Sequence, residues 1–186
     1  MSARRENSRP VSIRVVGTIR TPFPQASGTP IQAVYGEGIE ARVVVDEEYS
    51  PALDDIDGFD RIWLIYWMDR VEAFRPKVIP YRDIRERGLF ATRSPTRPNP
   101  IGMSVVRLLR REGNVLHVAD IDTLDGTPLL DIKPYVPEFD AHPGSRAGWL
   151  DAPGMDRRQL LEQFRHLGGL DRGAVRRRQA LVFDMD

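Results

Sequence analysis

The chain has 186 residues, of which 41% are hydrophobic, so it can form one ordinary domain with a small appendage and is not globally disordered. Its 27 basic and 27 acidic residues balance to a formal charge of zero, and nucleic-acid binding would therefore need basic side chains clustered on one face. The chain has no cysteine, which excludes disulfides, thiolate nucleophiles and metal centres with cysteine ligands.

Histidine spacing argues against a metal site, and hydropathy argues against a membrane span or a signal region. His117, His142 and His166 lie far apart and none belongs to an HExxH motif, so we expect no metal. No apolar run reaches the roughly 18 residues of a membrane span, and the N-terminus has no apolar signal region. We therefore expect a soluble, cytoplasmic protein with no membrane partner.

The first third of the chain predicts strands separated by a long loop. Residues 1–10 are polar and are expected to be disordered. The β-branched residues of 11–20 predict a strand, and residues 38–49 predict a second one. Between them, 22–38 are rich in proline and glycine, and a loop of this length in a compact domain is usually functional.

The middle of the chain predicts one short helix and several strands. Residues 50–60 suit a short helix with Ser50 as its cap and Pro51 at its first position. The run RIWLIYWMDR, residues 61–70, is almost wholly apolar and predicts a strand buried on both faces. Residues 77–84 and 87–93 are further strand candidates.

The remaining pattern predicts a small mostly-β barrel or a strongly coiled sheet. Residues 101–111 and 115–122 predict a hairpin, and 125–141 read as a loop around a short apolar piece. With about seven strands and one short helix, this domain would span 11–145. Apolar residues at helical spacing predict that 146–186 form a helical appendage.

The run FATRSPTRPNPIGMSVVRL places a rigid cationic loop before an apolar strand. Its fixed backbone positions are Pro95, Pro98 and Pro100. Such a loop holds Arg93, Arg97 and Asn99 at little entropic cost, and arginines held in this way bind anions well. The alternative of equal weight is a stiff strand connection with solvated arginines.

A second polar loop, DIDTLDGTPLLDIKPY, carries several carboxylates close to one lysine. They are Asp120, Asp122, Asp125 and Asp131, and the lysine is Lys133. A carboxylate cluster can bind a metal, but turn-forming and capping roles are more common, and Asp-Gly-Thr-Pro is itself a good turn sequence. We therefore favour the turn interpretation over a metal site.

Together, ATRSPTRPNPIGMSVVRL and DTLDGTPLLDIKPYVPEFD resemble the signature of the TsaA/TrmO-like (YaeB) family of tRNA N6-threonylcarbamoyladenosine methyltransferases. VGTIRTPF and GFDRIWLIYWM resemble its opening strand and aromatic central strand, so the similarity spans about residues 13–140. The resemblance implies a single-sheet β-barrel, a homodimer, S-adenosylmethionine as cofactor and tRNA as partner. The implied methyl acceptor is N6 of a threonylcarbamoylated adenosine beside the anticodon.

The resemblance also implies a set of cofactor-binding residues. They are Ala33, Val34, Tyr35, Asp69, Arg70, Arg93, Met103, Ala119, Asp120, Ile121 and Asp122. Backbone groups near Ile121 would read the adenine edge, and Met103 and Tyr35 would supply apolar faces unless they simply pack in the core. Arg93 would bind the cofactor carboxylate, and Asp122 would meet a ribose hydroxyl or the ammonium group.

On this basis we place a second set of residues around the methyl acceptor, as a hypothesis about the mechanism. Its members are Arg97, Asn99, Asp125, Lys133 and Tyr135. Arg97 or Lys133 would hold a carboxylate or a phosphate, and Asn99 would bond the base or a carbonyl. The N6 atom of a carbamoylated adenine is a poor nucleophile, so a base is useful, and Asp125 or Asp131 would serve as that base or orient Lys133.

Three functions remain open from the sequence. The first is the tRNA methyltransferase just described. The second is a methyltransferase of the same fold that acts on another nucleoside or a small molecule. The third is a non-catalytic barrel whose loops bind nucleic-acid phosphates.

Overall fold

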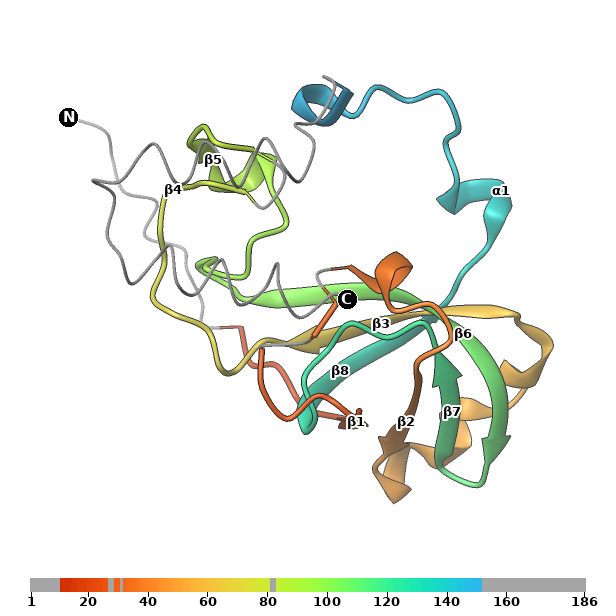
Figure 1. Cartoon of the computed structure of the whole chain (residues 1–186). Coiled ribbons are helices and arrows are strands. Elements are labelled where there is room, and N and C mark those ends of the chain that lie inside the picture. Colours follow the sequence, from red (N-terminus) through yellow and green to blue (C-terminus); the bar gives the residue numbers. More distant parts are fainter. Residues whose placement is uncertain (1–10, 27–28, 31, 81–82, 152–186) are drawn as a thin grey trace.

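A closed barrel of six antiparallel strands forms the centre of the molecule (Figure 1). This computed structural model describes residues 11–26, 29–30, 32–80 and 83–151. The strands, in the order in which they pair around the barrel, are β1 (Gly17–Arg20), β2 (Glu40–Val45), β7 (Val115–Ala119), β6 (Ile101–Glu112), β3 (Arg61–Trp67) and β8 (Thr127–Pro134). The predicted mostly-β, single-sheet barrel is therefore confirmed. The predicted disorder of residues 1–10 and the predicted helical tail beyond residue 151 lie outside the described residues.

Side chains along each strand point alternately into and out of the barrel, and those that point inward form its core. In β3, Ile62 and Leu64 are fully buried, whereas Trp63 and Ile65 on the opposite side are only partly covered. The prediction that this strand is buried on both faces is therefore wrong. A small barrel fills its own interior and leaves the other face of each strand outside, and here aromatic residues occupy that outer face.

Strand β8 corrects the prediction of a loop over 125–141. It pairs with β1 on one side and β3 on the other, and so closes the barrel. The sequence did not predict this strand, because it begins with turn residues and contains Pro128 and Pro134, and proline argues against a strand. Pro128 is its second residue and Pro134 its last, so both lie near the strand ends.

The hairpin predicted around residue 113 is confirmed as β6 and β7. Other elements are shorter than predicted. The first strand covers only β1, and the strands predicted over 77–84 and 87–93 reduce to β4 (Lys77–Val78) and β5 (Arg87–Gly88), a small arm outside the barrel. The predicted helix over 50–60 is instead the 3-10 helix η2 (Glu47–Leu53), with Asp46 at its N-cap and Pro51 inside it.

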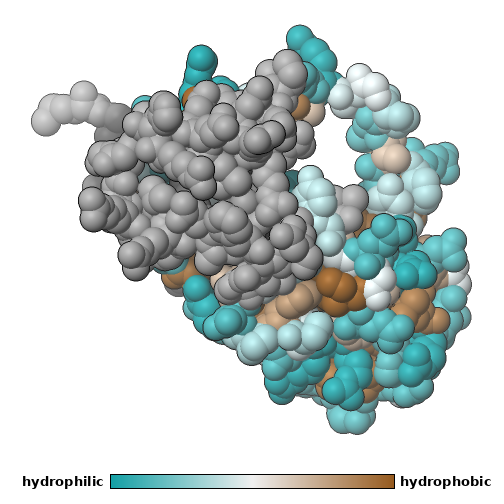
Figure 2. All heavy atoms as spheres, in the orientation of Figure 1, coloured by the Kyte–Doolittle hydropathy of each residue, from teal (hydrophilic) through white to brown (hydrophobic). Residues whose placement is uncertain are grey.

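Short helical turns complete the description. They are η1 (Ala33–Tyr35), η3 (Ile56–Gly58), η4 (Leu89–Ala91), α1 (Pro137–Asp140) and η5 (Gly148–Asp151). After α1 the chain leaves the barrel in an arc and returns to the arm, and the opening that it encloses stays open in the space-filling view (Figures 1 and 2). The arc is fastened at Trp149, whose Nε1 donates to the Ala91 carbonyl over 2.8 Å, while the Arg87 guanidinium lies 5.4 Å from the Trp149 ring centroid.

Candidate functional site

A pocket of about 420 Å³ lies where three loops meet the ends of β3 and β6. The proline loop contributes Arg93 and Arg97, the start of β6 contributes Met103, and the segment after β7 contributes Asp122. Tyr66, near the end of β3, completes this group. The two signature loops recognised in the sequence therefore share one cavity.

Arg93 joins the proline loop to the first long loop. Its Nη1 donates to Gln32 Oε1 over 3.0 Å, and both side chains line the pocket. Gln32 directly precedes η1, so this bond ties the predicted cofactor loop to the opposite wall. The guanidinium is solvent-exposed and can meet an anionic group of a bound molecule.

Asp122 is a carboxylate held by several donors. Ser104 Oγ donates to its Oδ1 over 2.6 Å, and the backbone N–H groups of Ala33 and of Asp122 itself also donate to it. Burial raises the pKa of Asp122 above its ordinary value, although these donors and the Arg93 charge act in the opposite direction. The pocket therefore contains an acidic group whose charge is sensitive to its hydrogen bonds.

Arg97 borders the pocket, but part of its guanidinium is engaged within the loop. Its Nη1 donates to the Thr92 carbonyl over 2.9 Å and to the Leu89 and Ser94 carbonyls over 3.4 Å each. The guanidinium also lies 5.4 Å from the ring centroid of Phe90. Arg97 therefore shapes the turn that carries Arg93, and its contact with an acceptor stays a prediction.

Asp120 has a different environment from Asp122. Its carboxylate accepts from the Gly38 backbone N–H over 2.9 Å and from Arg61 Nη1 over 3.3 Å, and Arg107 Nε lies 3.6 Å away. The residue has a φ of +67°, in the left-handed region. These contacts tie the turn before β2 to β3 and β6, and the side chain is not among those that line the 420 Å³ pocket.

Three other predicted cofactor residues, Tyr35, Ala119 and Ile121, are not among those that line the pocket. Ala119 and Ile121 are buried in the barrel, and Tyr35 on η1 is 48% exposed. Val34 lies on the same turn. A Cβ atom on Gly36 would lie 2.3 Å from the Ile121 carbonyl oxygen, so a glycine is needed where η1 meets this segment.

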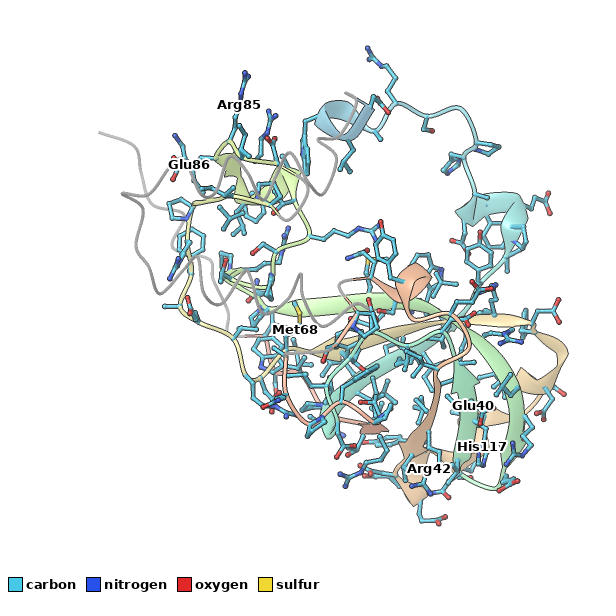
Figure 3. All side chains as sticks on the ribbon, in the orientation of Figure 1. Glu40, Arg42, Met68, Arg85, Glu86 and His117 are labelled. Atoms are coloured by element: carbon cyan, nitrogen blue, oxygen red, sulfur yellow. The ribbon has the colours of Figure 1, made fainter. Side chains whose placement is uncertain are left out.

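Asp69 and Arg70 form the turn after β3. Arg70 Nε lies 3.4 Å from Asp69 Oδ1, and Arg70 Nη2 donates to the Asp125 carbonyl. The Asp125 carboxylate accepts from the Thr21 backbone N–H over 3.1 Å. These contacts fasten the rim of the barrel, beside a second, open hollow of about 550 Å³ on β2 and β7, where Figure 3 labels Arg42 and His117.

The remaining acceptor candidates lie on other surfaces. Lys133 Nζ forms an ion pair with Asp131 Oδ2 over 2.8 Å on the outer face of β8. The Tyr135 ring lies 6.0 Å from that of Trp63. Asn99 is exposed within the proline loop. Of the predicted acceptor set, only Arg97 lines the pocket in the part of the chain that the structure describes.

Sequence reasoning missed several residues of this site. Tyr66, Gln32 and Leu124 line the pocket, and Ser104 lies behind it. The signal for Ser104 was available, because it is a polar residue at a core-facing position of the apolar strand IGMSVV. The position of Leu124 depends on the path of the loop after β7, and residue spacing in the sequence does not predict that path.

Two features were not found among the described residues, a metal-binding cluster and a membrane-spanning helix. Within the described ranges, no three His, Asp or Glu side chains gather as a metal site would require. No helix in that part of the chain has the length and apolar character needed to cross a membrane.

Known proteins resemble this chain over most of its length. The family model for the tRNA-methyltransferase O N-terminal domain matches residues 18–141. A probable S-adenosyl-L-methionine-binding protein of Pyrococcus abyssi is 50% identical over 141 residues, which are 76% of this chain and 77% of that protein. The tRNA (adenine(37)-N6)-methyltransferase of Escherichia coli is 32% identical over 144 residues, 72% of this chain and 61% of that protein. A crystal structure of TrmO from Pseudomonas aeruginosa matches with a TM-score of 0.67 at 30% identity, covering 95% of this chain and 81% of that one.

Proposed function

The chain belongs to the tRNA-methyltransferase O family of S-adenosylmethionine-dependent methyltransferases, and on that premise we propose that its substrate is threonylcarbamoyladenosine beside the anticodon of tRNA. The observation that carries this proposal is the shared pocket, which is lined by Arg93 and Arg97 of the proline loop and by Asp122 of the second signature loop. The similarity to the Escherichia coli tRNA methyltransferase supports the choice of acceptor.

The residues of the pocket fit the cofactor. Its volume of about 420 Å³ lies in the general range of small-molecule sites, roughly 300–1,000 Å³. Met103, Leu124 and the Tyr66 ring offer apolar surface for an adenine ring. Arg93 suits the amino-acid carboxylate, and Asp122 suits the ammonium or a ribose hydroxyl. The pocket thus offers groups suited to the adenine ring, the carboxylate and one hydrogen-bond donor of S-adenosylmethionine.

The protein contributes mainly position. When bound, S-adenosylmethionine supplies an activated methyl group on a sulfonium. Arg93 and Asp122 fix the ligand from opposite loops, and Arg97 presents its remaining N–H groups to a carboxylate or phosphate of the RNA. Orientation of this kind contributes up to about 7–11 kcal/mol to lowering a barrier, which is the main need of an in-line transfer.

Asp125, Lys133 and Tyr135 are not among the residues that line the pocket. We propose that the protein is a homodimer that acts in the cytoplasm, and that the outer face of β3, β6 and β8 is its contact surface. Ile65 lies on this face between Met103 and Asp131, and Met103, which is 51% exposed and also lines the pocket, stands where the contact surface would adjoin the pocket. Analytical ultracentrifugation of wild type and Ile65→Glu tests this, since the substitution should give monomers; a wild-type monomer would contradict it.

Nucleoside mass spectrometry tests the acceptor. A strain without this protein should lose the N6-methyl group of threonylcarbamoyladenosine in its tRNA and regain it on complementation. The purified protein, supplied with S-adenosylmethionine and tRNA that carries the unmethylated nucleoside, should restore the mark. An unchanged nucleoside profile in the deletion strain would show that another molecule is the acceptor.

A further inference from the structure

Three polar side chains connect the barrel interior with the pocket wall. Tyr66 Oη lies 3.0 Å from Ser104 Oγ, and Ser104 Oγ lies 2.6 Å from Asp122 Oδ1. Tyr66 and Ser104 are 7% and 3% exposed, and they come from the neighbouring strands β3 and β6. Tyr66 and Asp122 border the pocket, with Ser104 joining them from behind.

The chemistry of the three groups fixes the direction of these hydrogen bonds. When the Asp122 carboxylate is ionised it can only accept, and Ser104 then donates its single hydroxyl proton to Asp122. Ser104 Oγ then has only lone pairs to offer Tyr66, and the Tyr66 hydroxyl must donate to it. Burial raises the pKa of Tyr66 far above its ordinary value, so the phenol retains the proton that it donates.

We call the hydrogen-bonded chain from Tyr66 through Ser104 to Asp122 the relay. Packing holds the relay in place. A Cβ atom on Gly102 would lie 2.1 Å from Cε2 of Tyr66, so the Tyr66 ring lies directly against the Gly102 backbone. On the other side, the Ala33 backbone N–H donates to the Asp122 carboxylate. The carboxylate is therefore held between a rigid strand pair and the first long loop.

We propose that Tyr66 and Ser104 are positioning residues for the cofactor, which hold the ionised Asp122 carboxylate in the orientation that receives a donor group of S-adenosylmethionine. The donor is the ammonium or a ribose hydroxyl. This inference rests on the proposed placement of the cofactor in the 420 Å³ pocket. It assigns a function to two barrel residues that border or underlie the site and that the sequence pattern alone assigns to the core.

Calorimetric titration of the full chain with S-adenosylmethionine over a series of pH values tests the relay. Ser104→Ala should weaken binding about tenfold at neutral pH, the usual cost of losing a hydrogen bond to a charged group. The pH at which binding is half lost should also rise, because the carboxylate has lost a donor that favours its charge. Tyr66→Phe should shift both quantities in the same direction but less, and Ser104→Thr should restore them.

Two further variants distinguish a general loss of stability, a wrong placement of the cofactor and a wrong role for Tyr66 and Ser104. Val106→Ala removes buried volume on the same interior face of β6, and it should lower stability without moving the pH midpoint. If Asp122→Asn binds the cofactor like wild type, the placement of the cofactor in this pocket is wrong. If Asp122→Asn loses binding while Ser104→Ala and Tyr66→Phe keep wild-type affinity and midpoint, the positioning role is overturned. Tyr66→Phe keeps the aromatic ring, so it decides the matter even if Ser104→Ala does not fold.

Discussion

Asp120 and Asp122 are two residues apart after β7, yet their carboxylates bind different partners. Asp120 accepts from the Gly38 backbone and from Arg61, whereas Asp122 accepts from Ser104 and borders the pocket. The left-handed backbone of Asp120, with a φ of +67°, lies at the point where the two directions separate. One carboxylate therefore fastens the barrel, and the other is available to a ligand.

Asp120→Ala should lower the free energy of unfolding by about 2 kcal/mol, because it removes charge-assisted bonds and leaves alanine in a left-handed conformation. Chemical denaturation measures this loss. The matched control is Asp131→Ala, which breaks an exposed ion pair with Lys133 and should cost no more than about 1 kcal/mol. Normal stability combined with lost cofactor binding in Asp120→Ala would show that Asp120 acts in the site instead.

Asp122→Asn should raise the thermal stability of the protein at neutral pH. Since burial raises the pKa of the folded carboxyl above its unfolded value, the folded state binds this proton more tightly, and stability falls as pH rises between the two values. The neutral variant should therefore unfold at a higher temperature than wild type at neutral pH, and the difference should vanish in acid. Thermal unfolding at both conditions measures this effect. A variant less stable than wild type at neutral pH would contradict the sign.

Gly102→Ala should destabilise the barrel and disturb the relay. The added Cβ atom would lie 2.1 Å from the Tyr66 ring, and overpacking of this kind costs about 1–3 kcal/mol. Gly58→Ala is the control, because no atom lies within 4 Å of the position of its added Cβ. Denaturation of both variants should show the loss at Gly102 alone, and equal stability of the two would mean that the Tyr66 ring moves freely.

Arg97→Lys should impair methyl transfer without changing charge. Lysine cannot reproduce the guanidinium bonds to three backbone carbonyls of the loop, so residues 89–97 should lose order. We expect about a tenfold fall in kcat/KM for tRNA and faster hydrogen exchange in this loop. Arg85→Lys is the control, since Arg85 lies at the tip of the arm away from the pocket (Figure 3). Wild-type exchange in the loop would show that Arg97 does not organise it.

The strand pattern could be predicted well where alternation and turns agree. The hairpin of β6 and β7 follows from two β-branched runs around Gly113, which adopts a φ of +61°. Strand β8 was not predicted, because Pro128 and an Asp-Gly turn suggest a loop. Only the pairing with β1 and β3 makes this segment a strand, and that pairing is a long-range contact that no local pattern carries.

The sequence by itself determined the family, the barrel class and the two loops that carry the site. Proline and turn residues fix the local backbone of these long polar signatures, so the signatures can be recognised without the fold. The tertiary structure decided which of those residues meet. It brings Arg93, Arg97, Met103 and Asp122 to one pocket and places Lys133 on another surface. Strand register sets the side of the sheet on which each side chain lies, and one left-handed residue turns neighbouring carboxylates apart. Both depend on closure of the barrel, which local sequence does not specify.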